Sequence, residues 1–337
     1  MTDALTSDVR LNHAEPVIEP ERAICDAHHH LWNVEGNRYL LPDLLSDLGT
    51  GHRITSTVYV EWRSHYRTVG PVRLRSLGET EFAAAAANAA ATGPSSACAA
   101  IVGYVDLSLG AAAEPVLAAH LEAAGGRLRG IRNVASWDPD RDVMGGPPVC
   151  APHLYADRRF RQGFALLERF GLGFDAMLFQ TQLDDVIGLA DAFRYQPIVV
   201  NHVGGTLGIG PYAGRRDELF QAWRASIGEL ARRPNVWIKL GGLGMRRSGF
   251  RFHGQTPQPG SLEVAHAWRP WIDTCIEAFG AARCMFESNF PVDKASCSYV
   301  VLWNTFKRLA AGASETEKSD LFLGSASRFY RLDVPPR

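Results

Sequence analysis

The sequence predicts an α/β fold, a single barrel of eight parallel strands surrounded by helices. From residue 23 onward, short runs rich in β-branched and apolar residues alternate with longer alanine-rich or charged amphipathic stretches, which is typical of repeated βα units. Some short runs, such as residues 197–200 and 236–238, are apolar throughout, as expected of strands buried on both faces. The length of 337 residues is compatible with one such barrel.

The predicted elements follow one another from residue 23 to residue 332. The eight strands are expected at residues 23–28, 55–61, 99–106, 128–132, 173–179, 197–202, 235–240 and 283–289. The clearest helices are expected at residues 79–92, 157–170, 183–194 and 215–233, and the run of five alanines in the first favours a packed helix. Residues 1–22 have no clear period and are interpreted as an N-terminal arm, and residues 333–337 as a tail.

Composition limits the classes of partner. The 35 Lys and Arg residues nearly balance the 36 Asp and Glu residues, so no global field attracts nucleic acid or an anionic membrane, and a small-molecule substrate is expected. No apolar stretch of membrane-spanning length and no secretory signal is found, which predicts a cytoplasmic protein. The six cysteines lack paired metal-binding spacing and are expected to be buried and reduced. Assembly into a homo-oligomer is left open.

The carboxyl ends of the strands carry the reactive side chains, as expected in a parallel barrel. Strand alternation predicts that Asp26, His28 and His30 share one face of the first strand. Neutral imidazole is a common metal ligand and a good proton carrier. The sixth strand ends at His202, so we expect the imidazoles of His28, His30 and His202 to converge. Other strand ends carry Glu61, Arg132, Glu287 and Asn289.

Four motifs in this order resemble the amidohydrolase superfamily. They are the Asp-x-His-x-His-x-Trp run at residues 26–32, Arg-Gly-Ile-Arg at 129–132, Asn-His-x-Gly-Gly at 201–205 and Ser-Asn-Phe-Pro at 288–291. The branch most similar comprises metal-dependent TIM-barrel hydrolases that include sugar lactonases and 2-pyrone-4,6-dicarboxylate lactonase. The resemblance spans residues 23–332 and implies a (β/α)8 TIM barrel with long loops at its C-terminal face.

The resemblance also implies roles for individual residues. His28, His30 and His202 are expected to bind a metal ion or to contact the scissile carbonyl directly. Arg132 is expected to hold a substrate carboxylate or the developing oxyanion, for which a fixed guanidinium is well suited. The two-metal members of the superfamily use a lysine on the fourth strand, and here only arginines stand there. One divalent metal ion, preferably Zn²⁺, is therefore expected, and a metal-free site remains the alternative.

The chain departs from its relatives at residue 289, where most have an aspartate that binds metal and takes a proton from water. An amide has no basic oxygen at neutral pH, so Asn289 cannot replace that aspartate as a base. Glu287 is one candidate replacement and Asp293 is another. Each also has a structural interpretation, Glu287 as the partner of a buried arginine and Asp293 as a helix cap, and all these interpretations stay open.

Two long loops are expected to frame the mouth of the barrel. The loop at residues 244–261 is interpreted as a lid that carries His253, and the loop at residues 136–154 carries Trp137. Glu61, Trp62, Trp137 and His253 are predicted, with Arg132, to contact substrate. Lys239 could be a catalytic amine, but an ion-paired lysine is favoured.

The favoured function is hydrolysis of a small carboxylated or sugar-type lactone, with the histidine cluster polarising the carbonyl and Glu287 or Asp293 taking the proton. One alternative is metal-dependent non-oxidative decarboxylation of an aromatic or muconate-type acid, which the loss of the aspartate at residue 289 makes more plausible. A catalytically inactive barrel that binds a small molecule is the third interpretation.

Overall fold

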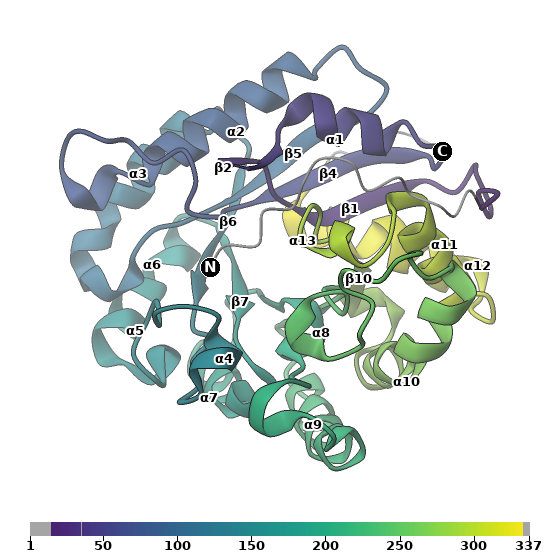
Figure 1. Cartoon of the computed structure of the whole chain (residues 1–337). Coiled ribbons are helices and arrows are strands. Elements are labelled where there is room, and N and C mark those ends of the chain that lie inside the picture. Colours follow the sequence, from purple (N-terminus) through teal and green to yellow (C-terminus); the bar gives the residue numbers. More distant parts are fainter. Residues whose placement is uncertain (1–14, 35, 333–337) are drawn as a thin grey trace.

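The computed structural model describes residues 15–34 and 36–332, and it confirms the barrel (Figure 1). Eight parallel strands are hydrogen-bonded in the order β1-β4-β5-β6-β7-β8-β9-β10. Their bounds are Ile24–His29, Ile54–Val60, Ser96–Gly103, Leu128–Val134, Gly173–Met177, Ile198–Val200, Val236–Leu240 and Cys284–Phe286. Each overlaps a predicted strand. The ends of β1 and β10 nearly close the barrel, since His30 N donates to Phe290 O at 2.8 Å.

Helices surround the strands on the outside (Figure 1). The α-helices from α1 to α7 span Leu41–Leu48, Leu77–Ala89, Glu114–Ala123, Arg141–Met144, Arg158–Phe164, Leu166–Arg169 and Leu183–Ala192. Those from α8 to α13 span His202–Gly205, Arg216–Ala231, Ser261–Phe279, Tyr299–Leu309, Glu315–Ser319 and Ser325–Tyr330. The predicted helix at 157–170 is divided into α5 and α6, and a small hairpin of β2 (Trp32–Val34) and β3 (Asn37–Tyr39) follows β1.

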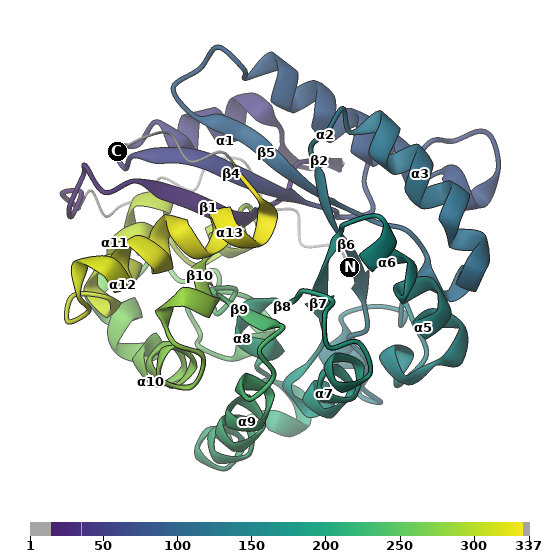
Figure 2. The same ribbon diagram turned by 180° about the vertical axis from the view of Figure 1, so that it is seen from behind.

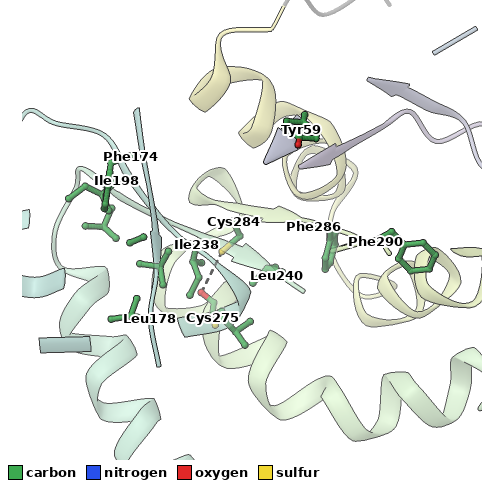
Figure 3. Close-up of a cluster of buried hydrophobic side chains, with 14 of the residues drawn as sticks. Tyr59, Phe174, Leu178, Ile198, Ile238, Leu240, Cys275, Cys284, Phe286 and Phe290 are labelled. Carbon is green, nitrogen blue, oxygen red and sulfur yellow. Dashed lines mark hydrogen bonds between the residues drawn. The ribbon is translucent and has the colours of Figure 1, made fainter. Parts of the chain in front are cut away.

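The continuous apolar runs are explained by two separate cores. Ile198 and Val200 of β8 belong to the core between strands and helices, whereas Val199 belongs to the core inside the barrel. Figure 3 shows part of the outer core, where Cys284 Sγ of β10 lies 3.6 Å from the backbone oxygen of Cys275 in α10. The strands are therefore buried on both faces, as the sequence predicts.

The C-terminal helix α13 supplies two aromatic side chains to the core inside the barrel. Phe329 and Tyr330 join small strand residues there, and the Phe329 ring packs against Trp237 at a centroid distance of 5.7 Å. Trp237 lies at the start of β9, so α13, which lies beside β1 and β10 (Figure 2), covers the amino-terminal end of the barrel. The opposite end remains for the functional side chains.

The alternation predicted for the first strand is wrong at Asp26. Cys25 and Ala27 belong to the core inside the barrel, whereas Asp26 Oδ2 accepts a hydrogen bond from Tyr299 of α11 at 3.0 Å. The pairing of β1 with β4 shifts register between Asp26 and His29, which brings His28 back to the interior. Asp26 therefore does not share the face of the two histidines.

The described part of the predicted arm packs on the outer helices. Glu15 Oε1 accepts a hydrogen bond from Ser261 N at 2.6 Å, and Lys307 donates to Ile18 O at 2.7 Å. Residues 1–14 and the predicted tail at 333–337 lie outside the described residues. All six cysteines are free, and five are buried while Cys150 is partly exposed. Within the described ranges, no helix has both the length and the apolar character that crossing a membrane requires.

Candidate active site

A cavity of about 360 Å³ opens at the carboxyl ends of the strands. The predicted site residues that line it are His30, Trp62, Arg132, His202, Asn289 and His253. A second group, comprising His28, Glu61, Glu287 and Asp293, is buried directly behind these side chains. Trp137 is not among the lining residues; its backbone N donates to Gln182 Oε1 at 2.9 Å.

The structure brings the three predicted imidazoles together. The ring centroids of His28 and His30 lie 4.7 Å apart, and those of His28 and His202 lie 4.6 Å apart. His202 reaches this position from a turn after β8 in which its φ is 56°. Three histidines from two distant segments of the chain thus share one small space.

The hydrogen-bond partners assign the free nitrogen of two of the three rings. His30 Nδ1 lies 2.7 Å from Val60 O, and because a carbonyl only accepts, Nδ1 carries the proton and Nε2 is free. His202 Nδ1 lies 2.7 Å from Glu287 Oε1, and His28 Nδ1 lies 2.8 Å from Glu287 Oε2. The contacts of His30 and His202 leave their Nε2 atoms as the available lone pairs. His28 Nδ1 lies close to both Glu287 Oε2 and Lys239 Nζ, and its Nε2 lies 3.1 Å from that of His30.

Burial keeps the His28 and His30 rings neutral. It lowers the pKa of His28 well below 6.5, and the nearby positive charge of Lys239 lowers it further. Burial likewise lowers the pKa of His30, with a contribution from Arg132. Neutral imidazoles in this arrangement have the protonation state that a metal ion requires of its ligands.

Glu287 links two of the histidines. Its Oε1 accepts hydrogen bonds from both the backbone N of His202, at 3.0 Å, and Nδ1 of the same residue. Its Oε2 is buried and, within the described part of the chain, has no aligned hydrogen bond despite its proximity to His28. His28, His202 and Glu287 offer ligand atoms within 4.8 Å of one another, so the Glu287 side of these rings is a second place beside the Nε2 atoms where the residues fit a small divalent cation.

Three glycines after β9 make room for the site. A Cβ at Gly241 would lie 2.5 Å from Glu287 Cγ, and one at Gly242 would lie 2.4 Å from His202 Cγ. A Cβ at Gly244 would lie 2.9 Å from Asp293 Cγ. Each glycine therefore allows close approach of a different functional side chain, a role that the strand and loop pattern of the sequence did not reveal.

Arg132 is fixed by Glu61. Its Nε donates to Glu61 Oε1 at 2.8 Å, and its Nη2 donates to the backbone oxygen of Glu61. The remaining nitrogen, Nη1, lies 3.4 Å from His28 Nε2. Glu61 is therefore a partner of Arg132, and Arg132 is the member of the pair that reaches the cavity.

Asn289 and Asp293 form a second buried pair. Asn289 Nδ2 donates to Asp293 Oδ1 at 2.8 Å, and Gly244 N donates to Asp293 Oδ2 at 3.0 Å. Burial raises the pKa of Asp293 to about 7. The amide lines the cavity and the carboxylate lies behind it, so neither Glu287 nor Asp293 has direct access to the cavity.

The ion pair expected for Lys239 is present inside the barrel. Lys239 Nζ lies 2.7 Å from Asp175 Oδ1 and donates to Ala27 O at 2.9 Å. Tyr330 and Asn201 donate to the same Asp175 carboxylate. The lysine is completely buried, and its Nζ lies 3.3 Å from His28 Nδ1, below the imidazole cluster.

Comparison with known proteins identifies the family. The model of the amidohydrolase family matches residues 25–332. The chain belongs to this family. It is 30% identical to the uncharacterised protein y4mH of Sinorhizobium fredii, over 92% of this chain and 99% of that protein. It is 27% identical to an L-fucono-1,5-lactonase of Burkholderia multivorans, over 92% of this chain and 96% of the relative.

A solved amidohydrolase of Burkholderia multivorans with bound zinc has a similar structure. Its TM-score is 0.70 at 26% sequence identity, and the match covers 93% of this chain and 100% of that chain.

The rim of the amidohydrolase cavity is positively charged. Arg246 and Arg247 line it together with His253, all from the predicted lid loop, and no carboxylate of the described residues pairs with either arginine. The guanidinium of Arg247 lies 5.4 Å above the Phe179 ring, and burial lowers its pKa. Asp142 is the one carboxylate among the described lining residues. The cavity is therefore suited to an anionic ligand.

Sequence reasoning placed the 136–154 loop at the mouth of the barrel but named the wrong residue from it. It proposed Trp137 from this loop, whereas the lining residues are Ser136 and the segment 142–145 that includes part of α4. Trp62, by contrast, lines the cavity as a wall and lies 4.9 Å from the His30 ring. The turn that starts α4, capped by Asp140, could have indicated that residues 142–145 turn back toward the mouth.

Proposed function

We propose that this amidohydrolase opens a small carboxylated lactone by acyl transfer to water. The observation that carries the proposal is the convergence of the three imidazoles beside Arg132 at the base of a cationic cavity. A volume of about 360 Å³ suits a small ring compound. The 27% identity to a protein named as a sugar lactonase supports ester hydrolysis, and the unpaired Arg246 and Arg247 support a carboxylate on the substrate.

One divalent ion, preferably Zn²⁺, is proposed as the cofactor, with His28, His30 and His202 as the residues that would hold it through Nε2. The zinc in the related amidohydrolase and the 3.1 Å separation of two of these nitrogens support this assignment. When bound, the ion would polarise the substrate carbonyl and lower the pKa of water. Glu287, which contacts Nδ1 of both His28 and His202, would fix the orientation of the two rings.

Two protein side chains would stabilise the carbonyl oxygen and accept the proton. Arg132, held by Glu61, donates from Nη1 to the carbonyl oxygen as negative charge develops on it. Glu287 is the favoured final acceptor of the proton, and because its carboxylate lies behind the cavity lining, the proton reaches it through the imidazole cluster and not directly from the cavity. Asp293 is less suited to this role because it contacts the cluster side of the cavity only through the Asn289 amide.

A panel of γ- and δ-lactones, with and without a carboxylate, tests the proposal. Hydrolysis is followed by the colour change of a pH indicator, before and after chelation and with metal analysis of the purified protein. Proton release from carboxylated lactones that chelation abolishes is the expected result. Release of CO₂ from hydroxybenzoates or carboxymuconates would favour decarboxylation instead, and inactivity on both classes with no bound metal would favour the binding-protein alternative.

A further inference from the structure

The Asn289 and Asp293 side chains place an amide, and not a carboxylate, at the cavity. Asn289 is 1% exposed and lines the cavity, whereas Asp293 is completely buried and lies behind it. The two are joined by the hydrogen bond from Asn289 Nδ2 to Asp293 Oδ1 at 2.8 Å. The pair thus joins the cavity to a carboxylate that substrate does not reach.

This hydrogen bond fixes which end of the amide faces the cavity. An ionised carboxylate can only accept hydrogen bonds, so ionised Asp293 takes the N–H of the amide. Asn289 Oδ1 is consequently the atom left for the cavity, and a free Asn289 side chain would lose this preference by rotating about its last bond. A fixed amide oxygen accepts a hydrogen bond from water but does not remove its proton.

The carboxylate is itself held rigidly. Gly244 N donates to Asp293 Oδ2 at 3.0 Å, and the approach is so close that a Cβ at Gly244 would lie 2.9 Å from Asp293 Cγ. On the other side, Asn289 N donates to His28 O at 2.8 Å. The pair is therefore anchored to the backbone of β1 and to the loop after β9, and both anchors adjoin the imidazole cluster.

We propose that Asp293 is a positioning residue that holds Asn289 Oδ1 toward the attacking water. In this arrangement the amide orients the nucleophile and Glu287 accepts the proton, so the two tasks that one aspartate would combine are divided between two residues. Orientation of a nucleophile is by itself a substantial part of catalysis, since a misplacement of about 1 Å can cost about 100-fold in rate. The inference rests on the proposed lactone hydrolysis.

Substitutions that exchange carboxylate and amide at residues 289 and 293 test the proposal. In Asp293→Asn the residue behind Asn289 carries both a donor and an acceptor, so the amide is no longer held in one orientation. We expect kcat on the preferred lactone to fall about 10- to 100-fold while KM stays within about threefold. In the double variant N289D/D293N the hydrogen bond is restored with donor and acceptor exchanged. Its kcat should recover at least about tenfold over D293N and exceed that of N289D alone, which carries the same cavity carboxylate without an amide behind it.

Asp157→Asn is the matched control, because it replaces a carboxylate that caps α5 outside the cavity lining. It should leave both constants unchanged. An active wild-type enzyme whose D293N variant keeps full kcat would overturn the role of Asp293 alone. A D293N variant that loses activity without rescue by the double exchange would show a merely structural role and overturn it as well. A wild type that hydrolyses no lactone would overturn the proposed function together with this inference.

Discussion

The glycine after β9 that faces His202 allows a test of how tightly the imidazole cluster is packed. Gly242 has a φ of +67°, and a Cβ built there would lie 2.4 Å from His202 Cγ and 2.5 Å from its Nδ1. Because ordinary van der Waals contact begins at 3.4 Å, Gly242→Ala requires the His202 ring to move by about 1 Å. That movement acts directly on the hydrogen bond from His202 Nδ1 to Glu287, which is 2.7 Å long.

Two terms set the expected effect of Gly242→Ala on stability. The left-handed backbone costs an alanine about 1 to 2 kcal/mol, and the overpacking against His202 costs about 1 to 3 kcal/mol. The free energy of unfolding should therefore fall by about 2 to 5 kcal/mol. Activity should fall more steeply than stability alone would suggest, by about 100-fold, since the displaced ring is one of the three that face the reacting group.

The assay measures lactone hydrolysis, bound zinc and thermal unfolding of the same preparation. Gly228→Ala is the control, because Gly228 lies within α9 and a Cβ there meets no atom within 4 Å. This control should gain about 0.5 to 1 kcal/mol in stability and keep its activity. A Gly242→Ala variant that binds zinc and hydrolyses lactone within threefold of the wild type would refute the claim that this contact positions His202.

Three further outcomes follow from the buried charges. Glu287→Gln should weaken zinc binding about 10- to 100-fold in a competition titration, because the imidazoles lose the carboxylate that orients them, and unchanged affinity would contradict that role. Asp175→Asn leaves the charge of Lys239 unpaired and should lower the free energy of unfolding, measured in urea, by about 3 to 5 kcal/mol. The double variant with Lys239→Met should regain most of this stability, and an equal loss in both variants would argue against the ion pair. Burial raises the pKa of Asp293 from 3.8 to about 7, so the folded protein holds this proton more tightly than the unfolded chain. The resulting stabilisation is fully present below about pH 4 and is lost as the pH rises through 7. Over this range the free energy of unfolding should fall by up to about 1.4 kcal/mol per pH unit. Asp293→Asn should flatten this dependence in unfolding measured at pH 5 and 8, and an unaltered slope would assign it to other groups.

The strands could be predicted from the sequence because both of their faces are buried. A run such as residues 198–200 must be apolar on both sides, and this pattern is visible without knowledge of its neighbours. The ends of the strands were less accessible to prediction. β10 ends at Phe286, three residues before the predicted end, because the chain turns at Asn289 with a φ of 53°. Turns of this kind depend on contacts with β1 that no local pattern records.

Some features of the site could likewise be predicted from the sequence, and others could not. His28, His30 and His202 could be predicted because a parallel barrel brings strand ends together whatever their separation in sequence. The side chain of Asp26 could not be placed, because the register of β1 is irregular between Asp26 and His29. Likewise, residue 242 must be a glycine because the His202 side chain, which follows β8, lies too close for a Cβ. Close packing between segments is a tertiary property, and the sequence shows only that a glycine is present.

The pairing of charges around the cluster supports the proposed metal ion. Arg132 has its own carboxylate in Glu61, and Lys239 has its own in Asp175. Glu287 is completely buried, and among the described residues no lysine or arginine lies within ion-pair distance of it; its charged-group contacts are the imidazoles of His28 and His202. Because a buried carboxylate without a counter-charge is costly, the cluster is stabilised either by a divalent ion on the imidazoles or by a proton shared with them. Under the proposed assignment of zinc to the imidazoles, removal of the ion should therefore be accompanied by uptake of a proton, which a proton-release measurement during chelation checks.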